Sequence, residues 1–194
     1  MEAQIAQLKL AQRTNQLVIV IAEAVEAEVS FWEKQDAKWR MKLQTKGYVG
    51  EAGIGNAREG SKVTPEGAFR LGQAFGKKDP GSKTAFRPIT ASDYWISNPE
   101  SAYYNTWQQF QTSEMDESLY AYSEHQYEFA RLIHYNTDPI IKGAGSAFFL
   151  HVENQRPTAG CVAVPREDMI KLIQATGEQA YIIHVKSKDV LHNY

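Results

Sequence analysis

The chain of 194 residues has a single cysteine, Cys161. One thiol excludes an intramolecular disulfide, and the absence of any C-x-x-C pair excludes a cysteine cluster for structural zinc. Long hydrophobic runs are also missing. The longest, residues 17–22, is far shorter than the ~20 residues of a membrane-spanning helix. The first residues, MEAQIAQLKLAQR, lack a basic stretch followed by an apolar one, so no signal peptide is visible.

Neither sign of charge is in excess, because 21 Lys and Arg residues face 23 Asp and Glu residues, for a formal charge of −2. Such a chain has no global attraction to phosphate backbones, so nucleic acid is not the expected partner. A hydrophobic fraction of 43% and an aromatic fraction of 11% exclude global disorder. The length predicts one domain, or one domain with a small appendage. We expect an N-terminal segment with a short helix over residues 1–15 and the main domain over 16–194.

Alternating apolar and polar residues predict a mainly β protein, either a sandwich or a barrel, with a few short peripheral helices. The strands are expected at residues 17–22, 27–31, 39–43, 68–74, 127–135, 146–152, 161–164 and 180–185. The second and third of these are separated by a short polar turn and predict a hairpin. Helices are expected at 165–175, between a proline and a glycine, and at 113–123, where Ser113 and Asp116 resemble a capping box.

Cys161 and His151 are the strongest candidates for chemistry. His151 ends the strand SAFFLHV, and Cys161 follows ten residues later at the start of the next strand. The two can meet across a hairpin-like connection, which would give a thiol nucleophile and a base. Gly160 precedes the thiol and allows close approach of a substrate to backbone N–H groups. The alternative is that both are ordinary strand residues, a small buried hydrophobe and a histidine bonded to a carbonyl.

Several other site classes are not supported. His134, His151 and Cys161 match no usual zinc spacing, so no metal site is predicted. The glycine-rich segment GEAGIGNAREG lacks the G-K-[ST] ending of a phosphate loop. Papain-like peptidases place the cysteine well before the histidine, and here the order is reversed.

Five segments in order carry a resemblance to a known family. They are 55–69 (GNAREGSKVTPEGAF), Tyr94-Trp95 with Tyr104-Asn105, 135–137 (YNT), 145–151 (GSAFFLH) and 158–162 (TAGCV). Together they resemble the YkuD-like L,D-transpeptidase catalytic domain, in the branch with a short His-to-Cys spacing. The T-P-x-G-x-F segment followed by S-x-x-x-x-H and T-x-G-C-V is the specific part. The resemblance covers roughly residues 16–185.

The resemblance implies a bacterial cell-wall enzyme with the β-sandwich or barrel-like fold of that family. Cys161 would attack a peptidoglycan stem peptide, release D-Ala and form a thioester, with His151 as general base and acid. The N–H groups of Gly160 and Cys161 would form the oxyanion hole. An amine of a second stem would complete a 3→3 cross-link. The family needs no metal or organic cofactor, is acylated by carbapenems on its cysteine, and acts outside the cytoplasmic membrane.

The sequence departs from the commoner family pattern at two positions. Ala159 replaces the motif histidine and Ala163 replaces the arginine, two features that the short branch shares. Substrate binding or orientation around the site is assigned to seven further residues: Ser146, Thr158, Asn136, Tyr135, Arg58, Tyr94 and Trp95. Their roles are hypotheses.

Two other functions stay open on the sequence. With water in place of the amine, the same site is an L,D-carboxypeptidase or endopeptidase that hydrolyses stem peptides. The second alternative is a non-catalytic wall-binding module that kept the fold. Loss of Cys161 or His151 would be its sign. The oligomeric state, the third stem residue and the acceptor cannot be read from the sequence.

Overall fold

The alternating residues of the second and third expected strands form a long hairpin, as predicted. In the computed structural model, which describes residues 1–194, its strands are β2 (Glu26–Gln35) and β3 (Lys38–Tyr48). Asp36 and Ala37 connect them with φ values of 48° and 61°. This left-handed geometry matches the twist of the two strands that a two-residue turn has to join.

The chain is mainly β, which confirms the predicted fold class. The other strands are β1 (Gln16–Ile21), β4 (Ile54–Gly55), β5 (Thr64–Pro65), β6 (Gly67–Gly76), β7 (Phe86–Pro88), β8 (Tyr94–Trp95), β9 (Trp107–Gln108), β10 (Glu117–Ser118), β11 (Phe129–Ile133), β12 (Phe149–Val152), β13 (Val162–Val164) and β14 (Tyr181–Val185). The helices are α1 (Glu2–Ala6), α2 (Arg166–Ala175) and the 3₁₀ turns η1 (Lys9–Gln12), η2 (Tyr120–Tyr122) and η3 (Lys188–Asn193). No helix is both long enough and apolar enough to span a bilayer.

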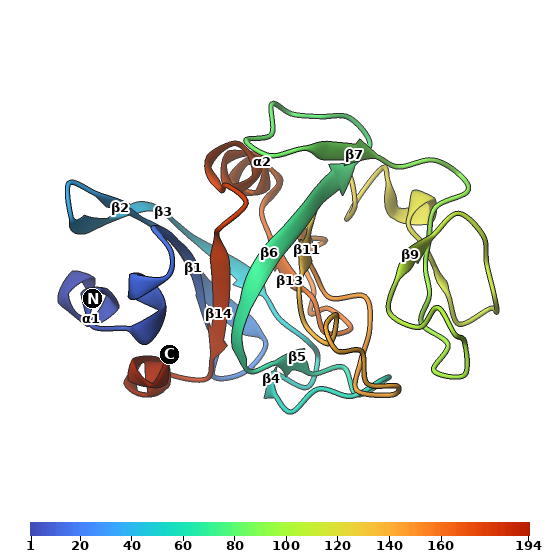
Figure 1. Cartoon of the computed structure of the whole chain (residues 1–194), viewed down its shortest axis with the longest axis horizontal. Helices are drawn as coiled ribbons and strands as arrows, with labels where there is room; N and C mark the ends of the chain where they lie inside the picture. Colours follow the sequence, from blue (N-terminus) through green and yellow to red (C-terminus); the bar gives the residue numbers. More distant parts are fainter.

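One sheet closes into a barrel. Its strand order is β11-β12-β13-β3-β2-β1-β14-β6-β7, and an additional antiparallel pairing between β11 and β6 joins the two sides. Closure leaves few unpaired strand edges. Figure 1 shows β6 and β14 side by side across the near face, with the strands of the hairpin behind them. Helix α2 packs against β11 and β12 at the upper end of the barrel.

Side chains alternate between the interior and the exterior of the barrel, as the period of two requires. Leu150 and Val162 point into a core of 22 buried residues that α2 completes. Their neighbours Phe149 and Cys161 point outward into a separate cluster of nine buried residues. Cys161 therefore lies on the outside of the barrel under a second layer of chain.

The two ends of the chain cover a different part of the outer surface. Residues of α1, η1 and η3 pack with β1, β14 and the hairpin in a third cluster of 11 buried residues. The backbone N–H of Leu10 donates a hydrogen bond to the carbonyl of Tyr194. Figure 1 shows both termini together on the left, away from β13, which Cys161 directly precedes.

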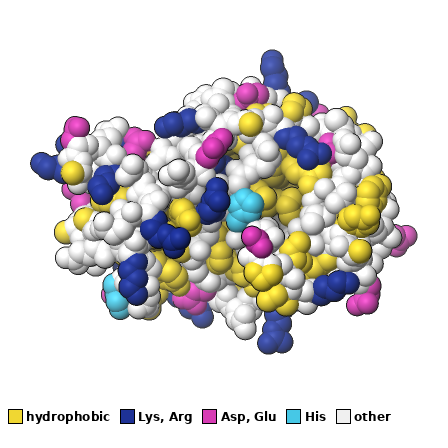
Figure 2. Space-filling view, in the orientation of Figure 1, with side chains coloured by type: hydrophobic (Ala, Val, Ile, Leu, Met, Phe, Trp, Pro, Cys, Tyr) yellow, Lys and Arg dark blue, Asp and Glu magenta, His cyan; other side chains and the backbone are white.

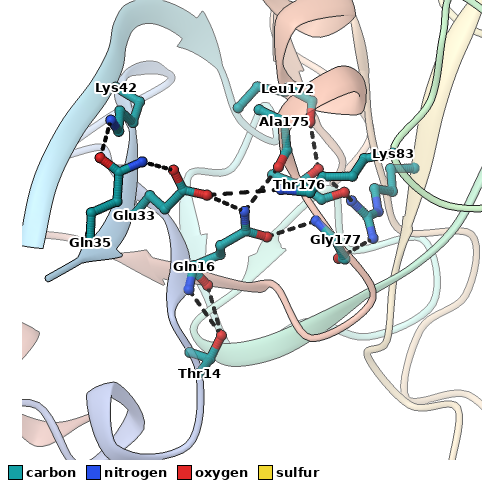
Figure 3. Close-up of polar contacts among 11 residues, drawn as sticks. Thr14, Gln16, Glu33, Gln35, Lys42, Lys83, Leu172, Ala175, Thr176 and Gly177 are labelled. Carbon is teal, nitrogen blue, oxygen red and sulfur yellow. Dashed lines mark hydrogen bonds and ion pairs between the residues drawn. The ribbon is translucent and has the colours of Figure 1, made fainter. Parts of the chain in front are cut away.

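A buried amide connects β1 to the end of α2. Gln16 Nε2 donates to Glu33 and to the carbonyl of Ala175, and Gln16 Oε1 accepts from the N–H of Gly177. Figure 3 shows this side chain between the hairpin and the helix terminus. Because the last carbonyls of a helix have no partner within it, such a contact fixes where α2 ends.

Residues 89–123 form a lobe beside the barrel, outside β6, β11 and β12. We call this segment the lobe; it contains β8, β9, β10 and η2 (Figure 1, right). The helix predicted at 113–123 is wrong, because only the short turn η2 forms there. Asp116 does accept hydrogen bonds from the N–H groups of Thr112 and Ser113, but it also accepts one from Ser97, nineteen residues earlier. This carboxylate therefore organises a loop rather than a helix.

Candidate active site

Cys161 lies directly before β13, and its side chain is only 9% exposed. Its thiol donates to the carbonyl of Ala147 at 3.3 Å and accepts from the N–H of Phe149 at 3.3 Å. The donor at Phe149 stabilises a thiolate, whereas the acceptor at Ala147 stabilises the protonated thiol. These two backbone groups hold the sulfur at a fixed position.

His151 lies on β12, the strand beside β13, and is 6% exposed. The two strands pair in parallel with Leu150 opposite Val162, so the predicted hairpin-like connection is wrong. Residues 153–160 run back along the barrel before β13 begins, and Thr158 N–H anchors them on the carbonyl of Val49. The parallel pairing still puts His151 and Cys161 on one face, because the register continued by one residue sets Cys161 beside Phe149, two residues before His151.

One nitrogen of the His151 ring is fixed by the backbone. Nδ1 lies 2.8 Å from the carbonyl of Val152, which can only accept, so Nδ1 carries the proton of the neutral ring. The other ring nitrogen, Nε2, forms no hydrogen bond within the chain. It is also not fully buried, unlike Ser146 Oγ and His184 Nε2, the two buried side-chain atoms that lack a partner. Nε2 is therefore a free base with access to solvent or substrate, and Val152 is the group that orients it.

The resting pair is neutral. Burial lowers the pKa of His151 to about 4, only partly offset by its bond to Val152. Burial also raises the pKa of the Cys161 thiol far above its ordinary value, and the negative charge of Glu117 raises it further. At neutral pH the site holds a thiol and a neutral imidazole. Proton transfer from sulfur to His151 is therefore expected to accompany attack on a substrate.

Two threonine hydroxyls hold the loop that precedes the thiol. Thr158 Oγ1 donates to the carbonyl of Cys161 at 2.7 Å and accepts from the N–H of Gly160 at 3.0 Å. Thr64 Oγ1 donates to the carbonyl of Gly160 at 2.8 Å. Of the two N–H groups expected to form an oxyanion hole, that of Gly160 is thus already bonded. The N–H of Cys161 has no acceptor among the loop and turn hydrogen bonds.

Gly160 is required by its surroundings. Its φ is +141°, and a Cβ at this position would lie 2.9 Å from the ring of Phe148 and 3.1 Å from the carbonyl of Val63. A real Cβ does not approach other atoms so closely. The glycine lets the loop pass between the barrel and the segment around Val63.

The lobe covers Cys161 with aromatic side chains. Trp95 packs edge-on against Phe149 with ring centroids 5.2 Å apart, and Tyr127 of the barrel packs against Phe149 at 5.4 Å. Tyr127 also contacts the ring of His151 at 5.5 Å. Figure 2 shows hydrophobic side chains gathered over the right half of this face, where the lobe lies. A layer of this kind excludes water from a reacting thiol.

Two carboxylates of the neighbourhood are each bonded by a tyrosine. Tyr127 donates to Glu117, and Tyr104 donates to Glu59. Burial raises the pKa of Glu117 to about 7, and the negative charge of Glu59 contributes to the rise, while the bond from Tyr127 opposes it. A carboxyl with this pKa can bind or release a proton near neutrality.

The structure brings some of the other predicted residues to Cys161. Thr158 bonds its carbonyl, and Trp95 is in the same buried cluster. Ser146 precedes Ala147, whose carbonyl accepts the thiol proton, and its hydroxyl is buried without a partner. None of these residues bonds the His151 ring, which uses Val152 instead.

The remaining predicted residues have structural contacts or none. Tyr135 donates to the carbonyl of Ala144, and Asn136 bonds the backbone of residues 141 and 145, so both shape the loop 136–145. Tyr94 is half-buried in the small sheet of the lobe, where it pairs with residues 108 and 118. Arg58 is exposed, and its guanidinium forms no ion pair.

Four residues at or near the site were not selected from the sequence: Thr64, Glu117, Tyr127 and Asn105. Thr64 and Asn105 lie in the segments that carry the family resemblance, and this position is the one feature of the sequence that points to them as site residues. Glu117 and Tyr127 gave none, because their hydrogen bond joins the lobe to the start of β11 and depends on the tertiary structure.

Comparison with known sequences matches one family. A sequence model of the YkuD family, described as the L,D-transpeptidase catalytic domain, matches residues 16–183. No curated protein is detectably similar to the chain. Among solved structures, the helical cell shape determining protein Pgp2 from Campylobacter jejuni is 18% identical, with a TM-score of 0.49 over 89% of this chain and 48% of that one. Bd1075 from Bdellovibrio bacteriovorus is 15% identical, with a TM-score of 0.49 over 100% of this chain and 57% of that one. The chain thus spans about half the length of these proteins.

Proposed function

The chain belongs to the YkuD family of L,D-transpeptidase catalytic domains, and we propose that it is a peptidoglycan L,D-transpeptidase that acts through a thioester on Cys161. The observation that carries this proposal is the arrangement of Cys161 and His151. The sulfur is held between two backbone groups, and the free Nε2 of the histidine shares its face of the barrel.

The first half-reaction transfers the stem peptide to the enzyme. His151 Nε2 takes the thiol proton as the sulfur attacks the carbonyl carbon of the third stem residue. The negative charge that develops on the carbonyl oxygen is stabilised by the N–H of Cys161. The bond to the terminal D-Ala then breaks, and His151 returns the proton to the leaving amine. The product is a thioester between Cys161 and the stem peptide.

The second half-reaction releases the enzyme. A side-chain amine of another stem attacks the thioester carbonyl, gives its proton to His151, and expels the Cys161 sulfur, which is reprotonated. The product is a 3→3 cross-link. With water as the nucleophile, the product is a shortened stem and the activity is that of an L,D-carboxypeptidase. We propose the amine rather than water as the nucleophile, supported by the burial of the thiol and by the aromatic side chains of the lobe packed around it, which limit access of water.

The substrate determines the rest of the proposal. Peptidoglycan stems mature outside the cytoplasmic membrane, so we place the domain in the periplasm or cell wall. The partner is the stem peptide of bacterial peptidoglycan, and the chemistry described above uses only groups of the protein. A role in cell-wall biogenesis follows from the product.

The test has two separate parts: intact-mass spectrometry after incubation with a carbapenem, and incubation of the unmodified protein with a disaccharide tetrapeptide. We expect a covalent adduct on the wild type and none on Cys161→Ala. The tetrapeptide reaction then distinguishes the activities, because a cross-linked dimer indicates transpeptidation and a tripeptide alone indicates hydrolysis. Absence of both acylation and turnover, in a folded protein whose thiol still reacts with iodoacetamide, would favour a wall-binding module.

A further inference from the structure

Asn105 connects the lobe to the barrel through a fully bonded amide. It is 3% exposed and has a left-handed backbone, with φ of +57°. Its Oδ1 accepts from the indole N–H of Trp95 at 2.8 Å and from the N–H of Ala147 at 3.2 Å. Its Nδ2 donates to the carbonyls of Asn136 at 2.7 Å and Tyr135 at 3.3 Å. Both lone pairs of the oxygen and both amide protons are used.

Ala147 connects this amide to the thiol. Its N–H is bonded to Asn105, and its carbonyl accepts the thiol proton of Cys161 at 3.3 Å. Ala147 also has a left-handed backbone, with φ of +57°. An alanine disfavours this conformation and keeps it only where the surroundings impose it. The hydrogen bond from Ala147 to Asn105 is the side-chain contact that does so here.

The second partner of the sulfur does not depend on Asn105. The N–H of Phe149 that donates to the sulfur belongs to β12, and the pairing of β12 with β11 and β13 fixes this strand. Loss of the Asn105 amide would therefore free one of the two contacts of the thiol and leave the other. The sulfur would keep its donor and lose the acceptor that directs the S–H bond.

We propose that Asn105 is a positioning residue for Cys161, which fixes the rotamer of the nucleophile through the peptide group of Ala147. This inference rests on the proposed acyl transfer at Cys161. The same oxygen of Asn105 accepts a hydrogen bond from Trp95, so one side chain fixes both an aromatic residue of the lobe that covers the thiol and the peptide group of Ala147.

The test compares two reactions of the same thiol. Acylation by a carbapenem requires a correctly oriented sulfur, whereas alkylation by iodoacetamide requires only an accessible thiolate. For Asn105→Ala we expect acylation to slow at least 10-fold and alkylation to change less than 3-fold or to speed up, both measured by intact mass. Equal slowing of both reactions would overturn the proposal.

Gln16→Ala is the matched control for lost stability. Gln16 is another buried side-chain amide with three hydrogen bonds, which join β1 to β2 and to the end of α2 (Figure 3). None of its partners bonds the thiol, whose contacts are Ala147 and Phe149. We expect this variant to unfold at a lower temperature and to keep the wild-type ratio of acylation to alkylation. A similar fall of the ratio in Gln16→Ala would contradict the proposal, because the effect would then reflect stability alone.

Asn105→Asp separates the two sides of the amide. It keeps an oxygen that accepts from Ala147 and loses both amide donors toward residues 135 and 136. If positioning depends on Ala147, the rate at which Asn105→Asp is acylated should be closer to that of the wild type than to that of Asn105→Ala. If the two variants are equally slow, the contact that matters is to the loop 136–145 and the proposal fails. This variant also serves if Asn105→Ala does not fold.

The pH dependence of alkylation tests the proposal even if the wild type is never acylated. The carbonyl of Ala147 stabilises the protonated thiol, so its release in Asn105→Ala lowers the apparent pKa of Cys161 and shifts the alkylation profile to lower pH. An unchanged profile would contradict positioning through Ala147. Absence of acylation in the wild type would instead contradict the proposed function, so the two failures are distinguishable.

Discussion

The hydroxyl of Thr64 donates a hydrogen bond of 2.8 Å to the carbonyl of Gly160, a residue 96 positions later in the chain. The same hydroxyl accepts from the N–H of Gly50 at 2.8 Å, and the side chain is fully buried. One oxygen thus holds the loop before the nucleophile against the glycine-rich segment that precedes β5.

Thr64→Val removes this oxygen at nearly constant volume. The N–H of Gly50 and the carbonyl of Gly160 then lose a partner in the interior, which costs roughly 1–3 kcal/mol of stability for each unsatisfied group. We expect a lower midpoint in urea denaturation and slower acylation of Cys161. Thr45→Val in β3, where the hydroxyl is exposed, serves as the control and is expected to change neither measurement appreciably.

His151→Ala removes Nε2, the ring nitrogen that has no hydrogen bond within the chain and that we propose as the base for the thiol. Loss of a general base slows a reaction by about 10²-fold or more. Carbapenem acylation followed by intact mass should show this loss, with circular dichroism unchanged. His134→Ala, an exposed histidine bonded to Thr137, should acylate at the wild-type rate. An acylation rate near wild type in His151→Ala would make His151 a structural residue.

The pH profile of acylation reports on the environment of His151. Its pKa is lowered to about 4 by burial, so the ring is a free base at any pH above that value. We expect the acylation rate to stay nearly constant from pH 7 down to pH 5 and to fall near pH 4. A histidine with an ordinary pKa of about 6.5 would lose more than 10-fold over the same interval. A midpoint near 6.5 would mean that substrate access rehydrates the ring.

His184 links stability to pH. Burial lowers its pKa to about 4, and Nε2 has no partner. Because the unfolded chain binds a proton on this ring below pH ~6.5 and the folded chain does not until about pH 4, stability is fully present above 6.5 and is lost as the pH falls through this window. The loss amounts to roughly 3 kcal/mol at ~1.36 kcal/mol per pKa unit. His184→Phe should lose less stability than the wild type between pH 7 and pH 4 in urea titrations.

Gly160→Ala tests how closely the nucleophile loop is packed. The added methyl group meets the ring of Phe148 at 2.9 Å and the carbonyl of Val63 at 3.1 Å. Overpacking of this kind costs about 1–3 kcal/mol, and the backbone shift that relieves it moves Cys161. We expect acylation to be nearly abolished in a variant that still folds. Gly143→Ala, where a methyl group meets no atom within 4 Å, is the control for a glycine with positive φ.

The sequence predicted the barrel better than the lobe, for a physical reason. Alternation along β2 and β3 is a local signal, because one face of the hairpin packs on the barrel core. The other face is covered near Trp32 and Trp39 by the chain ends, and along the rest of β3 it is largely exposed. In the lobe the contacts are between distant residues. Ser113 and Asp116 match a helix cap, but Asp116 also bonds Ser97 and forms a loop. No local pattern predicts such a contact.

The site shows the same division. Cys161 and His151 stand out in the sequence as candidates because each lies at a predicted strand end next to a recognisable motif. The parallel pairing of their strands was missed, because ten residues between the two suggested a hairpin. Asn105 and Thr64 were not assigned roles, because their partners lie 42 and 96 residues further along the chain.

The position of the chain ends has a practical consequence. The N–H of Leu10 is bonded to the carbonyl of Tyr194. Leu10 belongs to the cluster of 11 buried residues on the outside of β1 and β14, and Tyr194 packs against that cluster. Figure 1 shows this region at the opposite end of the molecule from the lobe. An affinity tag, a fluorescent protein or a linker to a solid support can therefore be fused at either end and leave the face of Cys161 open. Immobilised enzyme would present its thiol to polymeric peptidoglycan in an assay with insoluble substrate.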